Sequence, residues 1–236
     1  MSKPFIVTIV RGAGEHLSEE PYHFQTDDQN ERPMALDVLL QAQGTVMPNL
    51  AYRYGCRNAL CGVCTIDING KPKLACRTKL RNGDTLSALS SLPAVKDLVV
   101  NREHVNKQLR GKLAVRHSEL NPRSSEDLAS YQRLNQCIEC YACLTGCPMH
   151  DKNDASFEYG NPYALLKIQQ VRLDPRSSTQ DRDSALTLAK ELGMQECVSC
   201  KGCRCGVGID LKKEVIKPLV DSYTKNEKHI NQESDR

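Results

Sequence analysis

Twelve cysteines stand out in this chain of 236 residues, and they fall into three tight groups. The first group lies within residues 56–76, the second within 137–147 and the third within 197–205. Cysteines grouped in this way either form disulfides or bind metals. A disulfide framework is typical of short secreted chains, whereas this chain is long. We interpret its N-terminal segment MSKPFIVTIVRGAGEH as a strand and not as a signal peptide, because no small-residue cleavage site follows the apolar run. The cysteines are therefore predicted to be metal ligands.

The first group has the spacing C-x4-C-x2-C followed by a more distant fourth cysteine, in CRNALCGVC and KPKLAC. With this spacing, four thiolates hold a 2Fe–2S cluster in plant-type ferredoxins. A zinc site would more often use two C-x2-C pairs. Small residues beside the ligands, such as Gly55 and Gly62, would let backbone N–H groups approach the sulfur atoms. The predicted ligands of the 2Fe–2S cluster are Cys56, Cys61, Cys64 and Cys76.

The second group has the spacing C-x2-C-x2-C-x3-C-P, in CIECYACLTGCP. In bacterial ferredoxins the first three cysteines of such a run bind one 4Fe–4S cluster and the fourth binds another. The run therefore predicts a second, distant cysteine group, and CVSCKGCRCG supplies it. Each of the two groups is thus predicted to supply three cysteines to one cluster and the fourth to the other. One 4Fe–4S cluster is predicted on Cys137, Cys140, Cys143 and Cys205. The other is predicted on Cys147, Cys197, Cys200 and Cys203.

The first hundred residues have the pattern of a β-rich domain with one helix. FIVTIV and YHFQT suit a pair of strands over residues 5–10 and 22–26, and MALDVLLQAQG has apolar residues at helical spacing before a terminating glycine. Asn69-Gly70 is the favoured pair for a type I′ turn, so a hairpin is expected around it. DTLSALSSLPAVKDLVV suits one further strand ending near Val100. These elements predict an α+β fold whose first domain, residues 1–103, is a β-grasp domain of the plant-type 2Fe–2S ferredoxin kind.

After residue 101 the sequence becomes helical in character. Helices are expected in NREHVNKQLRGKLAVRHSEL, SEDLASYQRLNQC, PYALLKIQQVRLDPR and TQDRDSALTLAKELG, the second capped by Ser125 and the last ended by Gly193. The polar end TKNEKHINQESDR is expected to be a frayed tail. The second domain, residues 104–236, is therefore predicted to be helical and to bind two further clusters; the resemblance described below implies an α-helical ferredoxin domain.

The composition argues against several classes of function. A formal net charge of +3 gives no sign of a polyanion partner, and three Phe, eight Tyr and no Trp leave few rings to stack on bases, so no nucleic-acid partner is expected. No apolar run approaches the roughly 18–20 residues of a membrane-spanning helix. The sequence offers no Ser–His–Asp set, phosphate-binding loop or paired-carboxylate site. No catalytic residue is therefore predicted, and any flavin or substrate site is expected on another chain.

Over nearly its whole length the chain resembles the iron–sulfur subunits of succinate dehydrogenases and fumarate reductases. The resemblance rests on GCRNALCGVC…NGKPKLAC, on LPAVKDLVV and on CIECYACLTGCP with a late cysteine group. It implies a β-grasp domain followed by an all-α ferredoxin domain. It also implies two partners, an FAD-containing flavoprotein and a membrane-anchor or quinone-reactive subunit, between which this chain would relay electrons. The location implied is cytoplasmic, peripheral on the inner face of the membrane.

The chain departs from the resembled family in three places. Most members lack a cysteine three residues after the first late one and hold a 3Fe–4S cluster there. This chain has Cys200, which predicts a 4Fe–4S cluster, with 3Fe–4S as the alternative. Cys205 follows Cys203 after one intervening residue and precedes Gly206, where the family has a longer spacing and a proline. The Trp that the family often places after the central C-P pair is missing.

Some residues outside the cysteine groups have two interpretations. Most of the six histidines are expected on the surface, and His150 is the candidate for a quinone-side or proton-coupled group. A basic set around the first group is either a solvated face or a patch that docks the flavoprotein: Arg53, Arg57, Lys71, Lys73, Arg77, Lys79 and Arg81. The competing hypothesis for the whole chain is a binding protein in which clusters or zinc ions only hold the fold.

Overall fold

The structure, a computed structural model, describes residues 5–26, 32–107, 109–113, 115, 124–153 and 159–234. The chain divides into two compact units. The first comprises Met1–Arg102 together with Ile138–Thr145, and the second comprises Glu103–Cys137 together with Gly146–Arg236. The chain thus returns to the first unit for a short segment in the middle of the central cysteine run. The predicted domains, residues 1–103 and 104–236, stay a prediction.

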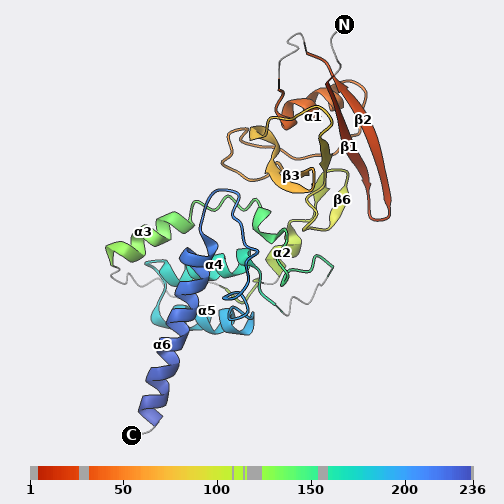
Figure 1. Cartoon of the computed structure of the whole chain (residues 1–236). Helices are drawn as coiled ribbons and strands as arrows, with labels where there is room; N and C mark the ends of the chain where they lie inside the picture. The colour runs from red at the N-terminus through yellow and green to blue at the C-terminus, as the bar shows by residue number, and fades with distance from the viewer. Residues whose placement is uncertain are drawn as a thin grey trace. The chain divides into compact units, whose positions relative to one another are not determined.

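The first unit is built on a mixed five-stranded sheet of order β2-β1-β5-β3-β4 (Figure 1). The β1–β5 pair is parallel, and the other neighbouring pairs are antiparallel. Its strands are β1 (Phe5–Ala13), β2 (His16–Phe24), β3 (Thr65–Ile68), β4 (Lys71–Leu74) and β5 (Thr85–Ser87). Strands and helix together give the α+β class that the sequence predicts.

The core of this unit joins the sheet to helix α1 (Ala35–Gly44). Val7 and Ile9 alternate along β1 and are fully buried, as a strand with one face on a core requires. Leu36 and Leu39 of α1 are buried in the same cluster, three residues apart on one helix face. The predicted helix is therefore confirmed, and its apolar stripe explains why it packs on the sheet.

Residues 84–100, predicted as one strand, form three short strands. The first is β5, and the other two, β6 (Ala94–Lys96) and β7 (Val99–Val100), pair in a separate two-stranded sheet. Asp97 makes the turn between them in the left-handed region, with φ of 49°. Its buried carboxylate accepts hydrogen bonds from the N–H groups of Gly12 (2.9 Å) and Ala51 (2.8 Å). These tertiary contacts stabilise a turn that local strand propensity does not reveal. The second predicted strand also begins earlier than expected, at His16.

The second unit is helical. Its described helices are α2 (Glu103–Lys107), α3 (Ser125–Leu134), α4 (Pro162–Leu173), α5 (Thr179–Glu191) and α6 (Lys217–Ser234), the last preceded by a π-helical segment, η3 (Lys212–Ile216). Three of them, α3, α4 and α5, begin with side-chain caps. Asn161 caps α4 by accepting a hydrogen bond from Ala164 N–H at 2.9 Å, and Ser178 and Asp181 form a capping box on α5. The predicted helices at α4 and α5 are confirmed, with Gly193 in the left-handed conformation after α5.

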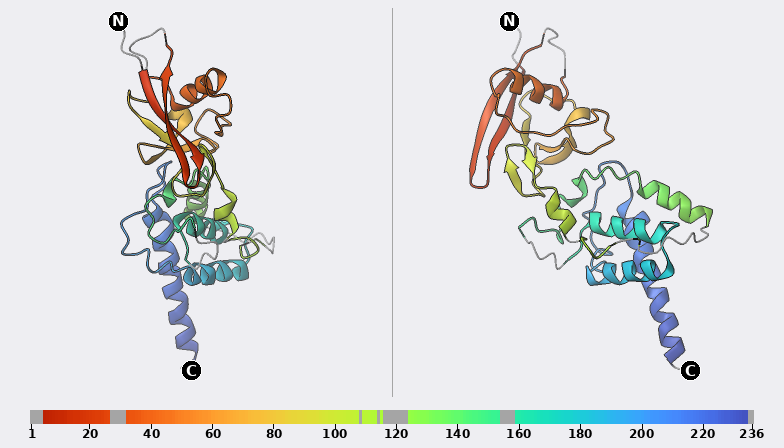
Figure 2. Two further views of the ribbon diagram at one scale, coloured as in Figure 1. Left: turned by 90° about the vertical axis from the view of Figure 1, so that its right-hand side faces the viewer. Right: turned by 180° about the vertical axis from the view of Figure 1, so that it is seen from behind.

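Three helix predictions need correction. The cap of α3 is Ser124, whose side chain accepts from Asp127 N–H, so the helix begins one residue earlier than predicted. In the predicted helical segment 101–120, only α2 is helical among the described residues, and residues 109–113 form turns. Residues 108, 114 and 116–120 lie outside the described parts. The predicted frayed tail belongs to α6, which is helical to Ser234 (Figure 2).

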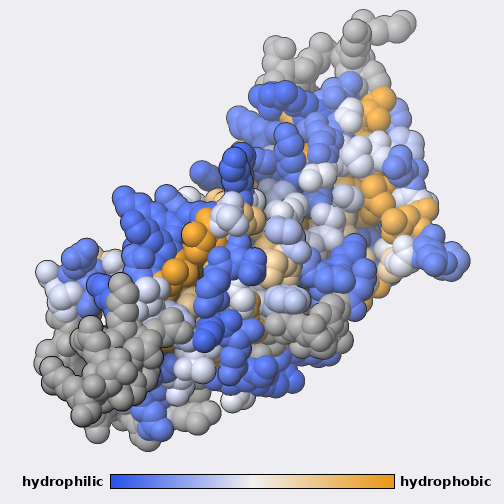
Figure 3. Space-filling view, turned by 60° about the horizontal axis from the view of Figure 1, so that its bottom comes forward, coloured by the Kyte–Doolittle hydropathy of each residue, from blue (hydrophilic) through white to orange (hydrophobic). Residues whose placement is uncertain are grey.

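The start of α6 explains why the polar tail is helical. Ile216 and Leu219 are buried, and Tyr223, one turn further on, lies under the ammonium group of Lys190 of α5 at 4.7 Å from the ring centre. The surface viewed in Figure 3 is mainly hydrophilic, with separate hydrophobic patches. Within the described parts of the chain, no helix combines the length and the hydrophobicity that crossing a bilayer requires.

Candidate iron–sulfur centres

The β3–β4 hairpin brings the two halves of the first cysteine group together. Cys64 lies directly before β3, and Cys76 follows β4 in a 3₁₀ turn, η1 (Ala75–Arg77). Asn69 and Gly70 have φ of 50° and 70°, as the predicted type I′ turn requires. The register closes with a hydrogen bond from Ala75 N–H to the carbonyl oxygen of Cys64 at 3.0 Å. The Asn-Gly turn therefore sets the proximity of Cys64 and Cys76.

Backbone N–H groups surround the other two sulfur atoms of the group. Cys56 Sγ accepts from Asn58 N–H at 3.3 Å and from Leu60 N–H at 3.2 Å, and Cys61 Sγ accepts from Cys56 N–H at 3.5 Å. The loop turns its amides inward because Arg57 and Ala59 adopt left-handed conformations, with φ of 57° and 56°. Alternating turns of this kind form anion-binding concavities that occur at iron–sulfur sites. Residues 56–61 therefore suit an anionic cluster.

Electrostatics separate the exposed thiol of this group from a buried one. Hydrogen bonds from Asn58 and Leu60 lower the pKa of Cys56 to about 7. The pKa of Cys64 is raised to about 11, mainly by burial and in smaller part by the nearby Cys76 and Cys61 thiols. Several thiols that disfavour one another's ionisation need a multivalent cation to become thiolates together. The donor set therefore fits an iron–sulfur cluster.

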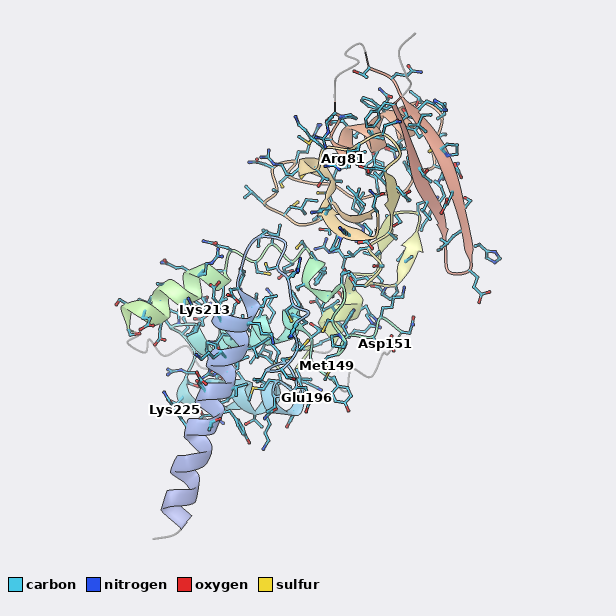
Figure 4. All side chains as sticks on the ribbon, viewed as in Figure 1. Arg81, Met149, Asp151, Glu196, Lys213 and Lys225 are labelled. Carbon is cyan, nitrogen blue, oxygen red and sulfur yellow. The ribbon has the colours of Figure 1, made fainter. Side chains whose placement is uncertain are left out.

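The structure also brings Cys147 to three cysteines of the late group. The pKa of Cys197 is raised to about 12, mainly by burial and in smaller part by interactions with Cys203, Cys147 and Cys200. Burial likewise raises the pKa of Cys203 to about 11, with contributions from Cys147 and Cys200. All four thiols are thus close enough for their charges to interact. Met149 and Glu196, labelled in Figure 4, lie on the two chain segments that meet here.

Backbone amides and one lysine complete this second thiol set. Cys147 Sγ accepts from the backbone N–H groups of Met149 and His150, and Cys200 Sγ accepts from Gly202 N–H at 3.4 Å. A Cβ on Gly202 would lie only 3.1 Å from the carbonyl oxygen of Gly146, so glycine permits the close approach of the two segments. Lys212 Nζ donates to the Cys197 carbonyl at 2.7 Å, and its charge partly offsets the rise in the pKa of that thiol.

Cys137 and Cys205 lie near the two ends of a hydrogen-bond network centred on Arg133. The guanidinium of Arg133 donates to the side chain of Gln136, the residue before Cys137. It also donates to the carbonyl of Gly208 at 2.5 Å, three residues after Cys205. Both segments belong to the second unit, whereas Cys140 and Cys143 belong to the first. The network favours a shared role for Cys137 and Cys205, and their assignment to one cluster stays a prediction.

Among the described residues, no three His, Cys, Asp or Glu side chains lie in an arrangement that would hold a single metal ion. A cluster of several iron and sulfide ions spaces its thiolates more widely than one ion does. The basic set predicted around the first group lies on the surface, since all seven side chains are exposed, and Arg57 pairs with Asp37 at 3.3 Å. Neither this docking role nor the proton-coupled role of His150 is tested by the structure.

Three basic residues near the cysteines escaped the sequence analysis: Arg102, Arg133 and Lys212. Each donates a hydrogen bond to the backbone carbonyl of a residue at or near a cysteine, and that residue is distant in sequence from the basic residue itself. No local pattern marks such a residue, because its partners are set by the tertiary fold. Only their positive charge near a cysteine group could have drawn attention to them.

Comparisons with known proteins agree with these features. Residues 6–107 match the family model described as a 2Fe-2S iron-sulfur cluster binding domain. The chain is 30% identical, over 88% of its length, to succinate dehydrogenase (ubiquinone) iron-sulfur subunit 1, mitochondrial, of Oryza sativa subsp. japonica, and it covers 78% of that protein. It is also 30% identical, over 86% of its length, to a subunit of the fumarate reductase (CoM/CoB) of Methanothermobacter marburgensis. It spans only 41% of that longer relative.

A solved structure shares the fold. The Mycobacterium smegmatis Sdh1 complex in the apo form contains a chain that matches with a TM-score of 0.79, over 96% of this chain and 98% of that one. The sequence identity is 23%, so this likeness concerns the fold alone.

Proposed function

The chain belongs to the family of succinate dehydrogenase and fumarate reductase iron–sulfur subunits, and we propose that it is the electron-transfer subunit of a multi-subunit oxidoreductase. It would relay electrons between a flavoprotein, of the succinate/fumarate type or acting on a related organic acid, and a quinone or membrane-anchor acceptor. It would make and break no substrate bond itself. The observation that carries this proposal is the convergence of Cys147 with Cys197, Cys200 and Cys203 from two distant segments.

Three clusters would be held by the twelve cysteines. Cys56, Cys61, Cys64 and Cys76 would bind a 2Fe–2S cluster. Cys137, Cys140, Cys143 and Cys205 would bind one 4Fe–4S cluster, and Cys147, Cys197, Cys200 and Cys203 would bind a second. When bound, such clusters accept and release single electrons, with potentials set by charge, hydrogen bonds and exposure. The chain's part is to supply thiolates, backbone N–H donors and nearby cations.

The domain arrangement belongs to the same proposal. Residues 1–103 would form the β-grasp ferredoxin domain, and residues 104–236 the α-helical ferredoxin domain. The match of residues 6–107 to a 2Fe-2S binding domain supports the first. Partner subunits would carry the FAD and the membrane contact, so that this chain would lie peripherally at the inner face of the membrane.

The proposal is tested on the full chain, expressed with its neighbouring subunits and purified without oxygen. Metal analysis should give about ten iron ions per chain and little zinc, together with visible absorbance that bleaches on reduction. Cys56→Ser should remove the 2Fe–2S signal and spare the others, whereas Cys147→Ser should affect only a four-iron cluster. Flavin in a copurifying subunit is the expected sign of the partner.

Zinc in place of iron, with no visible absorbance, would overturn the proposal in favour of a protein that uses metal only to hold its fold. About nine iron ions would keep the relay but replace the last 4Fe–4S cluster with 3Fe–4S. Clusters that neither the flavoprotein's substrate nor a quinol reduces would also contradict the relay.

A further inference from the structure

Two cysteine segments of the first unit touch at Gly62. This residue lies between Cys61 and Cys64 and has φ of 64°. A Cβ at this position would lie 2.2 Å from the carbonyl oxygen of Ile138 and 2.9 Å from the backbone nitrogen of Cys140. No side chain larger than hydrogen fits there. The backbone of the first cysteine loop therefore lies directly against the central cysteine run.

Arg102 spans the same junction with its planar guanidinium group. Nη1 donates to the carbonyl oxygen of Gly62 at 3.2 Å, and Nη2 donates to that of Glu139 at 2.5 Å. The guanidinium carbon lies 4.9 Å from the centre of the Tyr141 ring, within range of a cation–π interaction. One side chain thus connects the residue after Cys61 to the residue before Cys140 by two hydrogen bonds. A lysine could not reproduce this pair of hydrogen bonds, because its compact ammonium group lacks the planar, forked donor geometry of a guanidinium.

The two residues on either side of Cys140 adopt backbone conformations that favour the contact with Arg102. Glu139 and Tyr141 both adopt left-handed conformations, with φ of 52° and 57°. In this conformation the Glu139 carbonyl meets Arg102, and the Tyr141 ring lies beside the guanidinium. The Gly62 carbonyl also accepts a hydrogen bond from the hydroxyl of Thr65, at 2.8 Å. Several independent contacts therefore fix one arrangement.

The charge of Arg102 is directed at the two cysteine segments. Among the described residues it forms no ion pair, so no carboxylate there neutralises the guanidinium. Thiolate-bound clusters on both segments would be anionic, and a cation between them offsets their mutual repulsion and raises their reduction potentials. Arg102 thus has two separable effects. Its two hydrogen bonds fix the position of the first cysteine loop against the central run, and its positive charge affects the reduction potentials of the clusters.

We infer that Arg102 is a positioning residue that sets the spacing of the first cysteine loop against the central run, and with it electron exchange between them. The inference rests on the proposed function for the clusters and goes beyond it by assigning the residue that couples them. One electron is exchanged in the step, no bond is made or broken, and no proton is moved. The Gly62 carbonyl, the guanidinium and the Glu139 carbonyl form the hydrogen-bonded connection.

The test compares Arg102→Lys and Arg102→Met with Arg32→Lys and Arg32→Met, all in the assembled complex. Arg32 is an exposed arginine of the same unit whose side chain also donates to a backbone carbonyl, that of Leu80 at 3.3 Å. Hydrogen exchange of the amides of residues 138–141 should accelerate about tenfold or more in both Arg102 variants, because each loses at least one charge-assisted hydrogen bond. The magnetic interaction between the two reduced clusters, measured by EPR relaxation, should weaken in both Arg102 variants.

The 2Fe–2S midpoint potential should fall in Arg102→Met and stay near the wild-type value in Arg102→Lys. The Arg32 variants should match the wild type in each measurement.

Unchanged exchange and unchanged EPR relaxation in both Arg102 variants would overturn the inference while leaving the proposed function intact. A wild-type chain without iron would instead refute the proposed function, and hydrogen exchange would still report the junction. If Arg102→Met loses its clusters, Arg102→Lys decides, because it keeps the charge and removes only the fork.

Discussion

Replacing Gly62 with alanine should lower the stability of the first unit by more than the general cost of placing alanine in a left-handed conformation, because of the close contact at this position. Gly70 provides the matched control, since it has a similar φ of 70° but no atom within 4 Å of the position that a Cβ would take. In both variants alanine must adopt a left-handed conformation, which costs about 1–2 kcal/mol. Only at Gly62 must the new Cβ also move away from a backbone oxygen at 2.2 Å.

The size of the additional cost follows from the nature of the neighbour. Real Cβ contacts are not found below 3.0 Å, and the Ile138 carbonyl belongs to the backbone, so it cannot rotate away as a side chain would. Overpacking of this kind typically costs about 1–3 kcal/mol. We therefore expect a loss of about 1–2 kcal/mol for Gly70→Ala and about 2–5 kcal/mol for Gly62→Ala.

Native-state hydrogen exchange of the slowest amides in β1 and β3 is the appropriate assay. It reports the free energy of opening the first unit and does not require the whole chain to unfold in one step. Equal losses of stability in the two variants would refute the contact between Gly62 and the central cysteine run. A larger loss in Gly62→Ala, with faster exchange at residues 138–140, would support it.

Three further predictions concern the second unit. Cys200→Ser should lower the iron content by about one ion per chain and produce the EPR signal of an oxidised 3Fe–4S cluster; that signal in the wild type would contradict the assignment of Cys200. Arg133→Gln should reduce iron by about four ions per chain, because it releases the carbonyl of Gly208 and the side chain next to Cys137; unchanged iron would show that the network is dispensable. Hydrogen bonds from the Arg176 side chain lower the pKa of Asp174 from 3.8 to about 2, so this carboxylate stabilises the fold above pH 4 and loses its contribution as the pH falls towards 2. Asp174→Asn should therefore be less stable than the wild type at pH 7 in denaturant unfolding, and the difference should shrink between pH 4 and 2.

Features with a local cause could be predicted from the sequence. The Asn69-Gly70 pair specifies its own turn, and the apolar stripe of α1 specifies both a helix and the face that it buries. The grouping of cysteines also follows from spacing, because ligand geometry restricts how far apart along the chain such residues lie. These signals need no knowledge of the rest of the fold.

Features with a tertiary cause could not be predicted. The turn at Asp97 depends on N–H groups of Gly12 and Ala51, which are distant in sequence. The polar tail is helical because it continues α6, whose first turns pack on α5, although the composition of the tail alone favours solvent. Arg102 and Arg133 bind carbonyl groups, which every residue has, so nothing in the sequence identifies their partners.

The inclusion of Ile138–Thr145 in the first unit has a consequence for biosynthesis. The sheet and α1 emerge from the ribosome before this segment does, so the surface around Gly62 must wait for its partner. At about 5–20 residues per second, the interval between translation of Arg102 and Ile138 is roughly 2–7 s. During that time the first cysteine loop lacks the segment that lies against Gly62 in the folded unit, so this contact forms only after the rest of the unit has been synthesised.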